Sequence, residues 1–149
     1  GFLIKRDFKI LDLENINDSN KIKVKAGHNA YLKNFGCIHN RAVSIDKIKN
    51  KIVGEDKLMR KSVNSTIKYD VRFHLYPGIT AVETLGGSNL LIQINKNKAL
   101  LFSTNEKSLK IEKSIFFGGQ KVLDNYCIVI SGIMENNEKI INWEIVKKI

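Results

Sequence analysis

The sequence has little proline and cysteine and no long hydrophobic run. Its 149 residues include one proline and two cysteines, Cys37 and Cys127. These cysteines can form at most one disulfide, which excludes a disulfide scaffold and a domain held together by a cysteine-ligated metal. No apolar run approaches the roughly 18 residues that a membrane-spanning helix needs. Hydrophobic residues make up 43% of the chain and charged residues 27%, which excludes global disorder and favours one folded domain over residues 1–149.

Arginine is also scarce. The formal net charge is +10, but only four of the 25 basic residues are arginines: Arg6, Arg41, Arg60 and Arg72. A basic chain suggests a nucleic-acid partner, and the scarcity of arginine weakens that suggestion. The abundant residues, lysine, isoleucine and asparagine, all have A/T-rich codons, so codon bias explains the charge without selection for it. We therefore consider nucleic acid an unlikely partner and rank a nucleic-acid-binding domain last.

Apolar residues recur at every second position, a pattern typical of antiparallel strands with one buried face. Residues 21–25 place Ile22 and Val24 on one face and three lysines on the other. Residues 67–76 are two-sided in the same way. We expect the face with Tyr69, Val71, Phe73 and Leu75 to be buried. The opposite, polar face carries Lys68, Asp70, Arg72, His74 and Tyr76.

Turn-forming residues punctuate the second half of the chain and predict tight connections between strands. We expect a meander over residues 79–84, 90–94, 99–103 and 109–112, and a further pair of strands, 126–133 and 139–146, joined across Asn136-Asn137. The expected fold class is all-β, an antiparallel β-sandwich. A helix over residues 46–61 is an alternative to two short strands. Because the chain begins with Gly1 and not with methionine, we interpret it as a fragment of a larger multidomain protein.

Signatures of common active sites are missing. Gly86-Gly87 and Gly118-Gly119 lack the Gly-Lys-Ser and the helix of a phosphate-binding loop, so we interpret them as turn or bulge glycines. No Gly-x-Ser-x-Gly motif occurs, and Cys37 with His39 is too isolated to indicate a nucleophile pair. The three histidines do not have the spacing that places two imidazoles on one metal. We expect no metal and no cofactor.

Three aromatic residues have two interpretations each. Tyr31 and Phe35 lie four residues apart, and we favour core anchors over a sugar-stacking platform. Trp143 alternates with Ile141 and Ile145, which favours a buried position in the last strand over an exposed stacking residue.

Several short motifs follow one another in a definite order. They are Gly27-His28-Asn29-Ala30-Tyr31, Phe35-Gly36, Ile38-His39-Asn40-Arg41, Gly54-Glu55-Asp56, Arg72-Phe73-His74-Leu75-Tyr76-Pro77-Gly78, Ile111-Glu112-Lys113-Ser114, Phe116-Phe117-Gly118-Gly119 and Asn142-Trp143. From His28 to the C-terminus, their order and spacing resemble the C-terminal β region of heparinase II/III-like proteins, a polysaccharide lyase superfamily.

The resemblance implies a C-terminal β-sandwich that follows an N-terminal α/α toroid domain in the same parent chain. Such proteins cleave uronic-acid-containing polysaccharides by β-elimination, in which a base removes a proton beside the uronate carboxylate and an acid protonates the leaving oxygen. The family places these groups mainly in the toroid and in a His-x-His strand, and this sequence contains neither. We therefore expect no catalytic residue here, and we expect the chain alone to be inactive.

Six side chains are the candidates for binding an acidic polysaccharide. They are His28, His39, Arg41, Arg72, His74 and Tyr76. A location in the periplasm or outside the cell follows if the parent resembles the lyases in this respect. The alternative is a stand-alone module that binds a polyanionic carbohydrate and has no enzyme attached.

Overall fold

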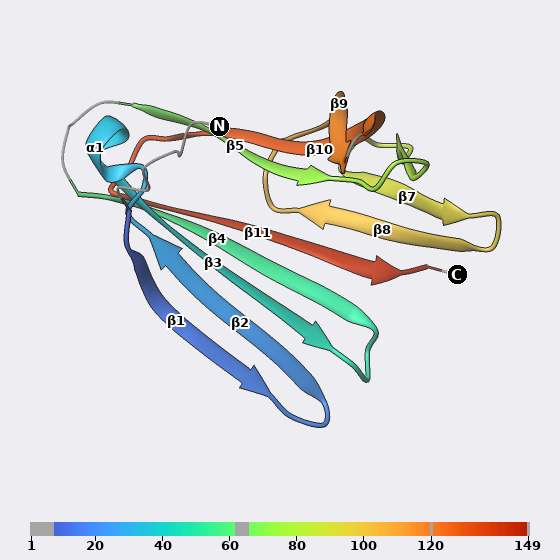
Figure 1. The fold of residues 1–149 in the computed structure, drawn as a ribbon, viewed down its shortest axis with the longest axis horizontal. Helices are drawn as coiled ribbons and strands as arrows, with labels where there is room; N and C mark the ends of the chain where they lie inside the picture. The colour runs from blue at the N-terminus through green and yellow to red at the C-terminus, as the bar shows by residue number, and fades with distance from the viewer. Residues whose placement is uncertain (1–7, 62–65, 120, 149) are drawn as a thin grey trace.

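A computed structural model describes residues 8–61, 66–119 and 121–148, which form strands and one short helix (Figure 1). The strands are β1 (Ile10–Asn17), β2 (Lys21–His28), β3 (Cys37–Asp46), β4 (Lys51–Arg60), β5 (Ile67–His74), β6 (Thr80–Glu83), β7 (Asn89–Asn95), β8 (Lys98–Thr104), β9 (Ser108–Gly118), β10 (Lys121–Met134) and β11 (Glu138–Lys147), and the helix is α1 (Leu32–Phe35). The predicted all-β fold is confirmed. Within the described residues, no helix has the length and apolar character needed to cross a membrane.

The strands form two antiparallel sheets that pack as a sandwich. The large sheet has eight strands in the order β1-β2-β3-β4-β11-β8-β7-β6, and the small sheet has three in the order β5-β10-β9. In Figure 1, β5 and β10 cross the upper part of the large sheet. The core between the sheets is built from side chains of both, including Leu90, Phe102, Ile128, Ile130 and Ile141, all at 0% exposure.

The aromatic part of this core confirms the face assignment of β5. Phe73 of the small sheet packs edge-on against Phe102 and Trp143 of the large sheet, with ring centroids 5.0 and 4.8 Å apart. Val71 is buried, whereas Arg72 and His74, which alternate with Val71 and Phe73, are exposed. Trp143 is 6% exposed, as expected for a residue of a buried strand.

Two predicted strand pairings are wrong. The C-terminal strands do not form a hairpin across Asn136-Asn137, because β10 lies between β5 and β9 in the small sheet whereas β11 lies between β4 and β8 in the large one. The turn residues there form a corner between the sheets, and Arg60 holds this corner through its side-chain hydrogen bond to the Met134 carbonyl, 3.1 Å. The meander also ends at β8, since β9 pairs with β10 and not with its neighbour in sequence.

The segment at residues 46–61 is strand, so the helical alternative is wrong. Asp46 ends β3, a turn that contains Asn50 at φ 50° reverses the chain, and β4 follows. Gly118 and Gly119 end β9 at the β9–β10 hairpin, and Gly86 and Gly87 lie in the turn between β6 and β7, so these glycines are turn glycines as predicted. Cys37 and Cys127 are both free and buried.

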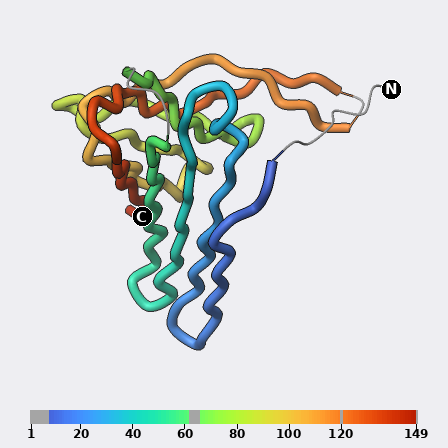
Figure 2. Tube along the Cα trace, turned by 90° about the vertical axis from the view of Figure 1, so that its left-hand side faces the viewer, coloured from blue at the N-terminus to red at the C-terminus, as the bar shows by residue number. Residues whose placement is uncertain are grey.

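The hairpins β1–β2 and β3–β4 project beyond the rest of the sandwich (Figure 2). Side chains on the inner face of the projecting part therefore stay partly open, with Val24 43% and Ile45 38% exposed. The one-turn helix α1 connects β2 to β3 at the opposite end of these hairpins. The candidate site lies at this end, where the part of the large sheet that the small sheet covers meets the part that it leaves open.

Candidate functional site

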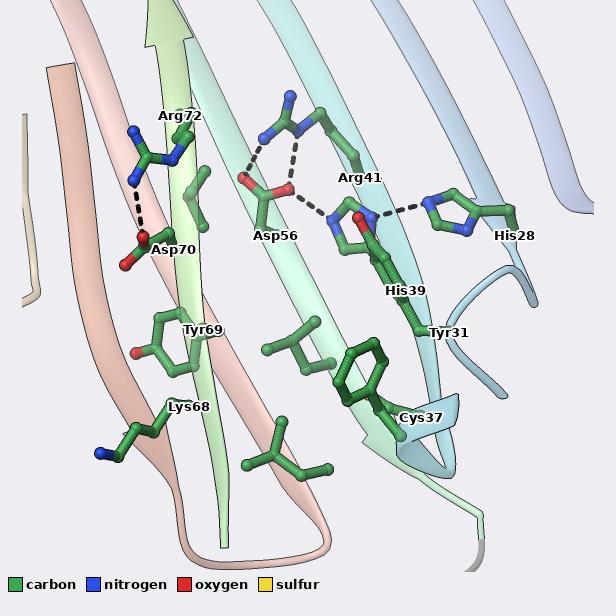
Figure 3. A pocket seen from close by; sticks show the side chains of 14 residues that line it. His28, Tyr31, Cys37, His39, Arg41, Asp56, Lys68, Tyr69, Asp70 and Arg72 are labelled. Atoms are coloured by element: carbon green, nitrogen blue, oxygen red, sulfur yellow. Dashed lines mark hydrogen bonds and ion pairs between the residues drawn. The ribbon is translucent and has the colours of Figure 1, made fainter. Parts of the chain in front are cut away.

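A cavity of about 480 Å³ lies between β5 and the large sheet (Figure 3). One wall comes from residues 67–72 of β5, an edge strand of the small sheet that pairs, among the described residues, with β10 alone. The other wall comes from β2, α1, β3 and β4. The cavity is therefore lined by the edge strand of the small sheet on one side and by the inner face of the large sheet on the other.

Strand register brings the polar side chains of the cavity together. His28 of β2 lies opposite His39 of β3, and Arg41 of β3 lies opposite Asp56 of β4. Residues that pair directly across antiparallel strands point to the same face, and so do residues two apart on one strand. His28, His39, Arg41 and Asp56 thus form one polar patch on the inner face of the large sheet.

A chain of hydrogen bonds fixes the tautomers of the two imidazoles. The Ala30 backbone N–H donates to His28 Nδ1 at 3.3 Å, so the proton of the neutral His28 ring is on Nε2. This Nε2–H donates to His39 Nδ1 at 3.2 Å, and His39 Nε2–H in turn donates to Asp56 Oδ1 at 2.7 Å. All four imidazole nitrogens in the cavity consequently have a partner.

Asp56 is the anchor of the patch. Its side chain is 0% exposed and accepts hydrogen bonds from His39, from Arg41 Nε at 2.7 Å and Nη2 at 3.1 Å, and from the Trp143 indole N–H at 2.9 Å. Burial alone would raise the pKa of this carboxyl, but the hydrogen bonds from His39 and Arg41, the charge of Arg41 and the hydrogen bond from Trp143 hold it below its usual value. Asp56 is therefore a buried carboxylate, satisfied on both oxygens.

His28 is held toward the neutral state. Burial lowers its pKa, and the neighbouring His39 lowers it further. Arg41 therefore provides the positive charge of the polar patch, and its side chain is 38% exposed. Asp56 engages Nε and Nη2 of Arg41, and no other described residue hydrogen-bonds to the remaining terminal nitrogen, which can therefore donate to a bound group.

An aromatic rim borders the cavity beside the histidines. Tyr31 is 45% exposed and Phe35 56% exposed, so the prediction that they are core anchors is wrong. Tyr31 packs against His28 with ring centroids 5.1 Å apart, and Phe35 follows one helical turn later, 6.2 Å from Tyr31. Gly36, at φ 61°, ends α1 in the left-handed conformation and lets β3 start directly after the rim.

Ion pairs organise the β5 wall. Arg72 lines the cavity and donates to Asp70 of its own strand and to Glu112 of β9, both at 2.8 Å. The hydrogen bonds to Glu112 and Asp70 raise the pKa of the guanidinium. Tyr69 also lines the cavity, and its hydroxyl donates to Glu106 at 2.9 Å.

The six predicted binding residues thus fall into two groups. His28, His39, Arg41 and Arg72 line one cavity. His74 and Tyr76 lie apart from this cavity, at the other end of β5, where the His74 ring contacts Ser114 at 3.2 Å and the Tyr76 ring packs on Phe116 with centroids 5.4 Å apart.

In the polar patch and the aromatic rim, three residues are not among the predicted binding residues. Asp56 appeared only as part of the Gly54-Glu55-Asp56 motif, and its role depends on the β3–β4 register, which lies outside the pattern of a single strand. The spacing of Tyr31 and Phe35 predicts core positions, because aromatics four residues apart are usually buried. The described residues hold no group of three or more histidine, cysteine, aspartate or glutamate side chains arranged to bind a metal ion.

Comparison with solved structures shows which folds are similar. The heparan sulfate lyase HepC from Pedobacter heparinus superposes with a TM-score of 0.77 at 14% identity, over 93% of this chain and 22% of that chain. A mutant of the same lyase superposes with a TM-score of 0.74 at 12% identity, over 93% of this chain and 22% of that chain. Heparinase III gives 0.63 at 15% identity, over 94% of this chain and 21% of that chain. The chain therefore spans about a fifth of the length of these proteins, and at this identity the likeness shows the fold.

Sequence comparison shows the family. No curated protein sequence matches this chain at a significant level. Residues 1–144, however, match the family model described as heparinase II/III-like, C-terminal. Because this match extends over nearly the whole chain and the fold agrees with it, the chain belongs to the heparinase II/III-like C-terminal family.

Proposed function

We propose that this chain is the C-terminal β-sandwich domain of a polysaccharide lyase that cleaves uronic-acid-containing polysaccharides by β-elimination. The family membership and the lyases among the similar structures support this proposal. In β-elimination the proton beside the uronate carboxylate moves to a base, the bond to the leaving oxygen breaks, that oxygen takes up a proton, and a carbon–carbon double bond remains in the uronate ring. The sandwich would work beside an N-terminal α/α toroid domain of the same parent protein.

The contribution of this chain would be substrate binding, not proton transfer. A histidine acts as a general base through a ring nitrogen whose lone pair is free. In the cavity, His28 and His39 have all their ring nitrogens engaged, by Ala30, by each other and by Asp56. This hydrogen-bond chain is the observation that carries the proposal that the chain alone is inactive.

The cavity is suited to one acidic sugar unit at its mouth. Arg41 offers a charged donor to a carboxylate or a sulfate, and Tyr31 offers a partly exposed ring face to a pyranose. Asp56 neutralises part of the Arg41 charge but is itself buried, so an incoming anion meets the guanidinium and not the carboxylate. The site therefore favours an acidic polysaccharide over a neutral one.

The decisive experiment uses the protein as its gene encodes it. We expect it to release unsaturated uronate from an acidic polysaccharide, detected by ultraviolet absorbance, whereas residues 1–149 alone bind the polymer without cleaving it. Cleavage by residues 1–149 alone would show that the catalytic groups lie in this chain. Absence of both cleavage and binding across sulfated and unsulfated uronate polymers would overturn the proposal.

Two variants test the cavity itself. We expect Tyr31→Ala to weaken polysaccharide binding about fivefold, whereas Tyr126→Ala, a tyrosine of similar exposure outside the cavity, changes it less than about twofold. We expect Arg41→Gln to weaken binding about tenfold, with Lys107→Gln as the control for one lost positive charge. Equal losses in variant and control would place binding outside the cavity.

The alternative is a carbohydrate-binding module that acts without a catalytic partner. The exposed rim of Tyr31 and Phe35, contained within this chain, favours it. It predicts the same binding results but no unsaturated product from the protein as encoded, so the cleavage assay separates the two functions.

A further inference from the structure

A second hollow, which we call the outer-face groove, lies on the opposite face of the large sheet, over β7 and β8. Its volume is about 670 Å³. Leu90 and Ile92 of β7 point into the core with exposures of 0% and 4%, so the residues that alternate with them, Asn89, Leu91 and Gln93, point outward. These three outward residues line the groove. The groove is thus separated from the cavity at His28 by the thickness of the sheet and by several strands.

Three lysines make the outer-face groove basic. Lys96 and Lys98 come from the β7–β8 hairpin, and Lys148 directly follows β11. Of the described residues that line the groove, none has an acidic side chain. In the described ranges, none of these lysines takes part in an ion pair, whereas the nearby outward-facing Glu144 is paired with Lys51. Among the described residues, the positive charge in the groove is therefore not paired with an acidic side chain.

The floor and the rim of the groove are chemically different. Leu91 lies opposite Leu101, and Ala99 lies on the same face of β8, two residues from Leu101, so the floor is apolar. Amide side chains border it, and the Gln93 amide is held in place by hydrogen bonds to backbone carbonyls of the β7–β8 turn. Amides offer both donors and acceptors, as sugar hydroxyls require, and an apolar floor suits the flat face of a pyranose ring.

We propose that the outer-face groove binds a short stretch of an acidic polysaccharide. Lys96, Lys98 and Lys148 face its sulfate or carboxylate groups, and the amides of Asn89, Gln93 and Asn97 face its hydroxyls. The part of the groove that the structure describes has neither the aromatic side chains on which nucleobases stack nor an arginine for bidentate phosphate contacts, so its chemistry favours a glycan over a nucleic acid. The argument rests on the groove alone and does not depend on the function proposed for the cavity at His28.

The test compares two variants that lose equal charge. One carries Lys96→Gln, Lys98→Gln and Lys148→Gln, and the other carries Lys49→Gln, Lys107→Gln and Lys121→Gln, which lie at exposed positions on other elements. Binding of a heparan sulfate oligosaccharide, of unsulfated hyaluronan, of neutral dextran and of single-stranded DNA is measured by calorimetry at two salt concentrations. Nuclear magnetic resonance follows the side-chain amide signals of Asn89, Gln93 and Asn97 in the wild type.

We expect the groove variant to bind the acidic oligosaccharide about fivefold more weakly and to lose part of the salt dependence, while the control changes less than about twofold. The relative effect on the sulfated and the unsulfated polymer identifies the anionic group. We expect the amide signals to shift on titration, also in Tyr31→Ala, which separates this site from the cavity at His28. Equal losses in the two charge variants, unshifted amide signals, or tighter binding of DNA than of glycan would overturn the proposal.

Discussion

Gly54 of β4 lies directly beneath the indole ring of Trp143 on β11. A Cβ atom at position 54 would overlap the six-membered part of this ring. The close approach lets the indole N–H reach Asp56, so the glycine positions the ring that donates to the carboxylate of the site. We expect Gly54→Ala to lower the free energy of unfolding by about 1 to 3 kcal/mol, measured by urea denaturation.

A double-mutant cycle checks this cause. Trp143→Phe removes ring atoms that would overlap the methyl group introduced by Gly54→Ala, at the cost of a buried aromatic contact and the hydrogen bond to Asp56. We expect the double variant to be more stable than the sum of the two single losses predicts. Strict additivity would mean that the indole is not what excludes a side chain at Gly54.

Neighbouring residues on β5 should differ sharply in their effect on stability. Phe73 packs against Phe102 and Trp143 in the core, whereas His74 is on the solvent side. We expect Phe73→Ala to lower the free energy of unfolding by about 3 to 5 kcal/mol and His74→Ala to lower it by less than about 1 kcal/mol. Thermal and urea denaturation measure both, and comparable losses at the two positions would contradict the face assignment.

The sequence predicts those parts of the fold that depend on patterns of residues close together in the chain. Alternation along β5 reveals its buried face, and turn residues reveal the β6–β7 and β7–β8 hairpins, because both patterns depend on residues a few positions apart. The choice of sheet is not local. At Ile128, Val129 and Ile130 the central strand β10 is buried on both faces, so no alternation marks its partner, and its placement between β5 and β9 depends on contacts distant in sequence.

The site was predictable to the same extent. His39 and Arg41 are two residues apart on one strand, so their common face follows from strand periodicity. Their partner Asp56 depends on how β3 pairs with β4, and His28 on how β2 pairs with β3. The exposure of Tyr31 and Phe35 follows from the place of α1 at the margin of the cavity, which the spacing of two aromatics does not reveal.

Removal of the Asp56 charge should weaken the fold and change its response to acid. Asp56→Asn keeps the shape of the side chain but removes the negative charge that accepts four hydrogen bonds. We expect the free energy of unfolding to fall by about 3 kcal/mol near neutral pH. The folded-state pKa of Asp56 lies below the usual 3.8, so its stabilisation is present above that value and is lost as the pH falls through the folded-state pKa.

Urea denaturation of wild type and Asp56→Asn over a series of pH values isolates this effect. Other carboxylates with lowered pKa, such as Asp70, contribute equally to both proteins. We therefore expect the stability difference between the two proteins to be constant above pH of about 4 and to shrink below it. A difference that stays constant down to the acid unfolding of the wild type would show that the carboxyl is not selectively stabilised in the folded state.

Lowering the pH toward 6 should reduce the stability of the fold through protonation of His28. Burial and the neighbouring His39 hold its pKa below the usual 6.5, so the unfolded chain takes up a proton before the folded chain does. Stability contributed by the neutral ring is thus complete above about pH 6.5 and falls as the pH drops from there to the folded-state pKa. We expect the His28 ring signals to titrate below pH 6.5 by nuclear magnetic resonance, with the urea-unfolded protein as the reference. We also expect His28→Gln to flatten the stability profile in that interval, and a His28 midpoint at or above the unfolded value would show that the cavity favours the imidazolium instead.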